Sequence, residues 1–457
     1  MKELIFYREL KTLINGIRSY GIQHCSTKDI NVLVSDPDKR NEFVIQVHKG
    51  FFIAQRNAII LLQKIIKEQK HLKIDLKQAR RNKDKKKIDD INDLCKKARY
   101  QEMVVRKAMD SIAWQLFGYE LTVMRRLYCG HEKIDITASN LESELRYIDW
   151  YTKENSDGFV LISDLTSFIQ IGDVVEFSPQ KGIHIGELKE GKTNFEILNI
   201  INNTAKMGCP LYLKSEWDKM DEKKKEQFHR DMKQIDRGLK ALQIINEGEG
   251  PDPLTGIPVK IKQAELKLDT FADTVRELLI KCGKKGHAIA VVEDCLLVGV
   301  YAADKFPSIA FDVWAETLKI TMPIADLRQG IFEPLGYPVF LQPFKDEFIF
   351  DIIQGKKVVK MTIDIDVWMK TFENDKITWR WLGEKETAQI NSGRRKGGRI
   401  FTLEGKGIEL RDKNGVTQYI GEGIFSRIFT GLNTPSSMRK LLIALMEKDN
   451  IEKPEQV

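Results

Sequence analysis

The strongest constraint on the fold is a long stretch without proline near the start of the chain. No proline occurs between Pro37 and Pro179, so no residue in this stretch lacks the backbone donor that a helix needs. Within residues 51–76 (FFIAQRNAIILLQKIIKEQKHLKIDL) apolar side chains recur at intervals of three and four. The spacing predicts long amphipathic helices over residues 51–120.

A polar, basic segment interrupts this helical region. Residues 80–90 (RRNKDKKKIDD) contain few apolar side chains, which predicts an exposed tip between two long antiparallel helices, the second over residues 90–118. One continuous helix with a solvated middle is the alternative. Residues 1–130 hold 27 Lys and Arg against 15 Asp and Glu, a net charge of +12, and the remainder holds 46 against 51, or −5. A basic region attracts polyanions, although a solvated helix face has the same composition.

The composition excludes several classes of protein. A chain of 457 residues with 42% hydrophobic side chains predicts two or three domains with packed cores. No apolar run approaches the ~18 residues that a membrane span requires, so no membrane association is expected. The charged start, MKELIFYREL, argues against a secretory signal. The six cysteines are scattered and form no CxxC pair, which predicts reduced thiols in a cytoplasmic protein.

The pattern changes to short β-like runs after Gly130. An amphipathic helix is expected over residues 139–152, and a polar helix is expected to end at Gly248. The β-like runs between them are FVLISDL (159–165), IQIGDVVEF (169–177) and IHIGELK (183–189). Further along the chain, residues 287–304 predict a hairpin of buried strands, and residues 434–448 predict the last helix.

Three charged residues in the second and third β-like runs point to chemistry. Asp173 is expected in one strand, and Glu187 and Lys189 are expected in the next, on the same face because side chains alternate along a strand. A turn at residues 178–182 would bring Asp173 beside Glu187. Two carboxylates with open water positions suit Mg²⁺, or Mn²⁺, which can activate water for attack on a phosphodiester. The lysine can orient that water or stabilise charge in the transition state.

This order of residues resembles the PD-(D/E)XK nuclease superfamily, which has the restriction-endonuclease-like fold. The acidic residue of the signature corresponds to Asp173 and its Glu-x-Lys to Glu187–Lys189, whereas Ile171 and Gly172 stand where the family name has proline. The resemblance covers residues 137–250. It implies a metal-dependent endonuclease, and a bacterial restriction or antiphage role, with DNA favoured over RNA as the substrate.

The resemblance also implies supporting residues on the flanking helices. Glu144 is the best match for the acidic residue that many members carry on the preceding helix, where it would be a third metal ligand, and Glu142 is the alternative. Gln234 and Arg237 are the candidates for the side chain that meets the scissile phosphate. Asp164 is interpreted as a turn or cap residue in preference to a ligand.

These inferences predict an α/β (α+β) fold in three parts. Residues 1–130 would form a basic helical domain, residues 131–305 a nuclease-like domain with a mixed sheet flanked by helices, and residues 306–457 an α+β region. Cleavage of both strands of a duplex usually requires two active sites, so a homo-oligomer is expected, or a partner protein, with the N-terminal helices as the interface.

Two alternatives to a nuclease stay open. The Glu187 and Lys189 side chains could form an ordinary exposed ion pair while Asp173 marks a turn. A nuclease-like module could also have lost its activity and serve to bind nucleic acid or a partner protein, and such binding would weaken steeply with salt without any cleavage.

Overall fold

The computed structural model describes residues 3–131, 135–136, 141–189, 191–261, 266–393 and 399–452. Residues 448–452 are described in backbone only. The chain divides into two compact units, Met1–Ile261 and Lys262–Val457. Both combine helices with small antiparallel sheets, so the fold is α+β. The predicted domain boundaries near residues 130 and 305 stay predictions. None of the described helices combines the length and apolar content that a membrane crossing needs.

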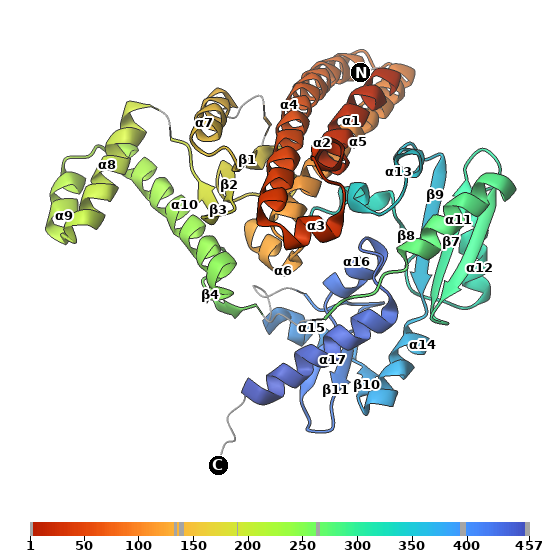
Figure 1. The fold of residues 1–457 in the computed structure, drawn as a ribbon. Helices are drawn as coiled ribbons and strands as arrows, with labels where there is room; N and C mark the ends of the chain where they lie inside the picture. Colours follow the sequence, from red (N-terminus) through yellow and green to blue (C-terminus); the bar gives the residue numbers. More distant parts are fainter. Residues whose placement is uncertain are drawn as a thin grey trace. The chain divides into compact units, whose positions relative to one another are not determined.

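Unit 1 contains a long helical hairpin, in the region where the absence of proline predicted long helices (Figure 1). Helix α4 (Pro37–Arg81) and helix α5 (Lys85–Leu116) are joined by only three residues, Asn82–Asp84. Asp36 accepts backbone bonds at the start of α4, and Asp84 does the same for α5. Three shorter helices, α1 (Glu3–Arg18), α2 (Tyr20–His24) and α3 (Ile30–Ser35), pack against α4. The alternative of one continuous helix is therefore wrong.

A three-stranded sheet follows the hairpin. Its order is β1 (Phe159–Ile162), β2 (Val174–Ser178) and β3 (Gly182–Gly186), and both pairings are antiparallel. The predicted mixed sheet is therefore wrong for the described residues, although the predicted turn between the second and third strands is confirmed. Helix α6 (Leu121–Met124) and helix α7 (Leu141–Glu154) precede the sheet.

Three helices follow the sheet and lead to a short hairpin. Helices α8 (Lys192–Met207) and α9 (Pro210–Asp218) share a small apolar cluster with α10 (Glu222–Glu247). Helix α10 ends at Gly248 in the left-handed conformation, as predicted. Strands β4 (Glu249–Pro251) and β5 (Pro258–Lys260) close unit 1.

Unit 2 contains the predicted 287–304 hairpin, but this hairpin does not extend the first sheet. Strands β6 (His287–Val292) and β7 (Leu296–Ala302) belong to a separate sheet of order β6-β7-β9-β8, with β9 at Lys357–Ile363 and β8 at Ala325–Asp326. A further sheet contains β10 (Thr378–Trp381), β11 (Ile408–Arg411) and β12 (Thr417–Tyr419). The helices of unit 2 are α11 (Ala272–Lys285), α12 (Ile309–Thr317), α13 (Asp346–Ile353), α14 (Ile365–Lys370), α15 (Glu384–Gly393), α16 (Gly423–Phe429) and α17 (Pro435–Glu452).

Candidate active site

The β2–β3 hairpin fixes the position of Asp173 at one end of the first sheet. The residue lies immediately before β2, not inside a strand as predicted, and its N–H donates to the carbonyl of Gly186 at 2.9 Å. Its own carbonyl accepts from the N–H of Ser163 at 2.9 Å. The carboxylate accepts from the N–H of Leu188 at 2.7 Å. Backbone and side chain are both held, so Asp173 is preorganised beside the Glu187–Lys189 segment.

Gly172 makes the turn that presents Asp173. Its φ is +78°, in the left-handed region that favours glycine, and an added Cβ would collide with the side chain of Ile185 and lie 3.2 Å from the carbonyl oxygen of Gly186. The N–H of Gly172 also donates to the Glu187 carboxylate, and this bond partly opposes the rise in the pKa of that group that burial causes. Glycine stands at position 172, where the PD-(D/E)XK signature has proline, and it allows the turn that positions Asp173.

Lys189 connects the end of β3 with helix α10. Glu187 and Lys189 follow β3, which ends at Gly186, so the predicted strand alternation does not apply to them. The Lys189 ammonium lies 3.5 Å from the Glu187 carboxylate and 3.3 Å from that of Asp231, and it donates to Oε1 of Gln234. Its side chain is largely buried, which strengthens these charged contacts relative to a solvent-exposed pair.

Asp231 is the site residue that the sequence analysis missed. It is fully buried on α10, and its Oδ1 also accepts from the amide of Gln227 at 3.0 Å. Asp231 lies one turn before the candidate Gln234, on the same face of the helix, but no local pattern in the sequence marks it as a site residue. Within the described part of the chain, Oδ2 of Asp231 has no hydrogen-bond partner.

Glu144 contributes another buried carboxylate, from α7. Burial, followed by repulsion from Asp164 and Asp173, raises the pKa of Glu144 to about 8. Its Oε2 is buried and accepts no hydrogen bond from any described group. The alternative, Glu142, has a side chain that is 93% exposed, so the structure favours Glu144.

The pKa values of two neighbouring carboxyl groups, Asp173 and Glu187, are also raised. Burial is the largest cause of the raised pKa of Asp173 and of Glu187, and repulsion from Asp173 adds to the shift at Glu187. The Lys189 ammonium opposes both shifts. Four carboxylates thus act on one another through charge in a poorly solvated volume: Glu144, Asp164, Asp173 and Glu187. Among the described ammonium groups, only that of Lys189 pairs with both Glu187 and Asp231.

The structure brings together most, but not all, of the predicted residues. Asp173, Glu187, Lys189 and Gln234 are linked by hydrogen bonds or ion pairs, directly or through Leu188, and Glu144 is coupled to Asp173 by charge. Arg237 has an exposed side chain and makes no recorded contact with these groups. The predicted phosphate-contacting role therefore fits Gln234 better than Arg237.

The helical hairpin supports the site through buried polar contacts. Gln55 of α4 donates to the carbonyl of Val160 at 2.9 Å and accepts from the N–H of Ile162 at 3.0 Å, so it satisfies the outer edge of β1. Asp110 of α5 accepts from the N–H and the hydroxyl of Ser167 at 2.6 and 2.5 Å, and it pairs with the fully buried Lys107 at 3.0 Å. These bonds fix the segment that leads from β1 to Asp173.

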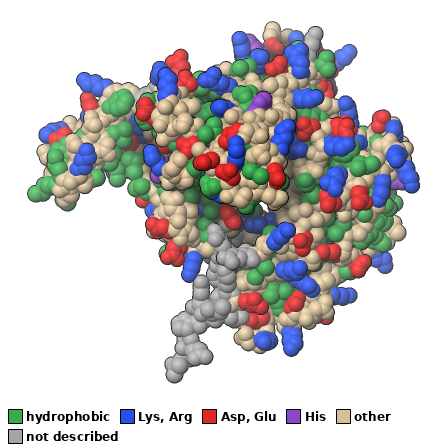
Figure 2. All heavy atoms as spheres, in the orientation of Figure 1, with side chains coloured by type: hydrophobic (Ala, Val, Ile, Leu, Met, Phe, Trp, Pro, Cys, Tyr) green, Lys and Arg blue, Asp and Glu red, His purple; other side chains and the backbone are tan. Residues whose placement is uncertain are grey.

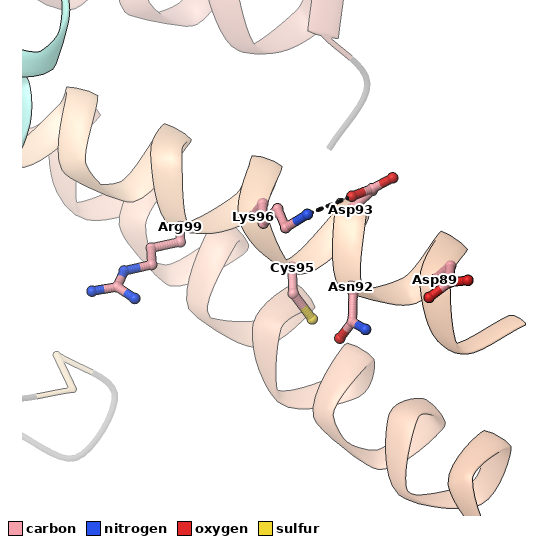
Figure 3. A pocket seen from close by; sticks show the side chains of 6 residues that line it. All are labelled: Asp89, Asn92, Asp93, Cys95, Lys96 and Arg99. Carbon is pink, nitrogen blue, oxygen red and sulfur yellow. Dashed lines mark hydrogen bonds and ion pairs between the residues drawn. The ribbon is translucent and has the colours of Figure 1, made fainter. Parts of the chain in front are cut away.

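A hollow lies along helix α5 and is lined by none of the candidate site residues (Figure 3). Six residues from one face of the helix line it: Asp89, Asn92, Asp93, Cys95, Lys96 and Arg99. The Lys96 ammonium donates to the Asp93 carboxylate at 2.9 Å. Both signs of charge line the hollow. On the face seen in Figure 2, Lys and Arg side chains likewise lie among Asp and Glu side chains and form no single continuous field.

Comparison with protein-family models, with curated proteins and with solved structures finds no match. The resemblance to the PD-(D/E)XK superfamily therefore rests on the sequence residues that carry it.

Proposed function

We propose that this protein is a metal-dependent phosphodiesterase that hydrolyses nucleic acid, with DNA as the favoured substrate, in the manner of PD-(D/E)XK endonucleases. The observation that carries the proposal is the approach of Asp173, Glu187 and Lys189. The backbone N–H of Leu188, the residue between Glu187 and Lys189, donates to the Asp173 carboxylate at 2.7 Å. An acid and a Glu-x-Lys are thereby joined at one end of a sheet.

The donor set fits a hard divalent cation in its chemistry. Asp173, Glu187 and Glu144 supply carboxylate oxygens, the ligands that Mg²⁺ and Mn²⁺ prefer, and one oxygen of Glu144 is buried without a partner. The pKa values of all three groups are raised, so a bound cation would stabilise their ionised forms. Among the described side chains, no three such groups stand close enough to hold one ion as they are placed here.

Each protein group has a proposed role. Asp173, Glu187 and Glu144 would hold the ion after some movement of their side chains, and a bound ion would supply Lewis-acid chemistry to the phosphodiester and to the attacking water. Lys189 would orient the attacking water or stabilise charge on the phosphorane-like transition state. Asp231 and Gln234 hold the Lys189 ammonium in place, and Asp231 is therefore a positioning residue.

Cleavage of plasmid DNA, linear DNA and RNA, each with Mg²⁺, Mn²⁺ or EDTA, tests the proposal. We expect the wild-type protein to cut DNA only with a divalent ion, and Asp173→Asn to reduce the rate about a hundredfold or more. Asp173→Asn keeps an oxygen that can accept the Leu188 bond, so its fold should be retained. Tight, salt-sensitive binding without cleavage in any of these conditions would favour the inactive binding protein instead.

A further inference from the structure

The second sheet ends on a strand with a free outer edge. Strand β6 is an edge strand that pairs with β7 alone. In the described part of the chain, the backbone groups of His287–Val292 bond only to β7 and to the turn that leads into it. A row of unpaired N–H and C=O groups is a template for another strand.

This edge lacks the features that usually prevent pairing between chains. The strand HAIAVV contains no proline and no charged residue, and its six residues pair with β7 in unbroken register. Proteins commonly protect an edge with a charge, a proline, a bulge or a covering segment. Strand β1 shows such protection, because Gln55 occupies its outer edge.

The edge also exposes apolar side chains. Ile289 is 50% and Val291 is 51% exposed, and the two project from the same face of β6. Beside them on β7, Leu297 and Tyr301 are buried in a cluster with Phe311 of α12. A second strand added at this edge would extend that apolar face over Ile289 and Val291.

The charges at the two ends of β6 are complementary. Lys284 and Lys285 precede the strand, and Glu293 and Asp294 follow it, all four with exposed side chains. In an antiparallel pair of two identical strands, the basic end of each copy lies beside the acidic end of the other. Opposite charges across a strand pair stabilise it, and like charges destabilise it.

We propose that β6 is a self-association edge, at which two copies of this chain pair antiparallel into one continuous sheet. The arrangement is two-fold symmetric, so the same surface serves both copies. With Ile289 opposite Ile289 of the second copy, Val291 lies opposite His287 and the lysines lie toward Glu293 and Asp294. The occupant of the edge is thus a second copy of the chain, recognised by its backbone, its apolar face and its charged ends.

Sedimentation equilibrium of the full chain over a wide concentration range tests the proposal. We expect the wild type to reach twice the monomer mass as concentration rises. Ile289→Lys should stay at the monomer mass, because it places two ammonium groups together at the symmetry axis. The matched control is Val313→Lys on α12. Val313 is exposed, and its neighbours Phe311 and Ala315 are buried, so it points away from the sheet; this variant should dimerise as the wild type does.

A cysteine variant tests the register without adding charge. In Ile289→Cys the two introduced thiols face each other, so mild oxidation should give a covalent dimer in denaturing gels, and Val313→Cys should not. A wild type that stays monomeric at every concentration would overturn the proposal. So would a dimer that Ile289→Lys leaves intact, or one in which Ile289→Cys and Val313→Cys cross-link equally.

Discussion

At the scale of single residues, the site depends on how its buried charged side chains are paired. Lys189 has three partners, Glu187 in its own segment and Asp231 and Gln234 on α10, and Glu144 has one carboxylate oxygen without any described partner. Burial makes an unpaired carboxylate costly, and the raised pKa of Glu144 expresses that cost. Stability and function are therefore expected to oppose each other at this position.

The pH dependence of stability should reveal Glu144. Its pKa rises from the ordinary 4.5 in the unfolded chain to about 8 in the fold, so between these values the native state binds the extra proton. Stability is then lost as pH rises through this window, at a limit of about 1.4 kcal/mol per pH unit for one group. Glu144→Gln resembles the protonated acid and should raise the melting temperature at pH 8 but not at pH 5, in metal-free buffer.

The control for this prediction lies two residues earlier on the same helix. Glu142 has an exposed side chain, so Glu142→Gln should leave the melting temperature within about 1 °C of the wild type at both pH values. An equal effect of Glu144→Gln at pH 5 and pH 8 would contradict the assignment of the buried charge to Glu144.

At the scale of elements, apolar periodicity predicted the helices better than the strands. The long hairpin, α7 and the end of α10 at Gly248 all follow from local patterns of apolar, proline and glycine residues. The strands are shorter than predicted, because Gly172 turns the chain before β2 and β3 ends at Gly186. Helices α8 and α9 were not among the predicted elements.

The limits of prediction at the site have a similar physical cause. The spacing of Asp173, Glu187 and Lys189 was visible in a local pattern, since a hairpin joins neighbouring strands. Asp231 was not, because its role depends on how α10 packs against the end of β3, more than forty residues along the chain. Contacts of that kind depend on tertiary packing, which no local periodicity encodes.

The turn at Gly172 should tolerate no side chain. Gly172→Ala combines an unfavourable φ with a collision against Ile185, so we expect a loss of several kcal/mol of stability and of the Asp173 position. Gly182→Ala is the control, because its φ is +76° but an added Cβ meets no described atom within 4 Å. Urea unfolding should show a loss of only about 1 kcal/mol for Gly182→Ala. Equal losses in the two variants would contradict the packing argument.

The contribution of the two Gln55 bonds at the outer edge of β1 to stability should also be measurable. Gln55→Ala removes both bonds at the strand edge and leaves the Val160 carbonyl and the Ile162 N–H buried without that partner. The expected loss in urea unfolding is about 2 kcal/mol or more. Gln63→Ala, at an exposed position of the same helix, should change stability by less than about 0.5 kcal/mol. An unchanged free energy of unfolding in Gln55→Ala would show that these two bonds contribute nothing to stability.

At the scale of the whole molecule, the hairpin and the first sheet belong to one unit. Asp110 of α5 joins them through its bonds to Ser167, in the segment between β1 and β2, and it also pairs with the fully buried Lys107 of its own helix. Removal of one partner of a buried pair leaves an uncompensated charge and typically costs about 3–5 kcal/mol. Asp110→Asn should therefore increase hydrogen exchange in β1 and β2 of unit 1, with little change in β6 and β7 of unit 2. Equal loss of protection in both units would contradict the division.

We propose that Lys189 takes part in metal-dependent cleavage, and single-turnover cleavage of DNA with Mg²⁺ measures its contribution. Lys189→Ala should lower the rate about a hundredfold or more, because no other described ammonium pairs with both Glu187 and Asp231. Lys192 lies three residues later, and its side chain is 92% exposed. Lys192→Ala should therefore cleave DNA at the wild-type rate. Full metal-dependent cleavage by Lys189→Ala would contradict the account.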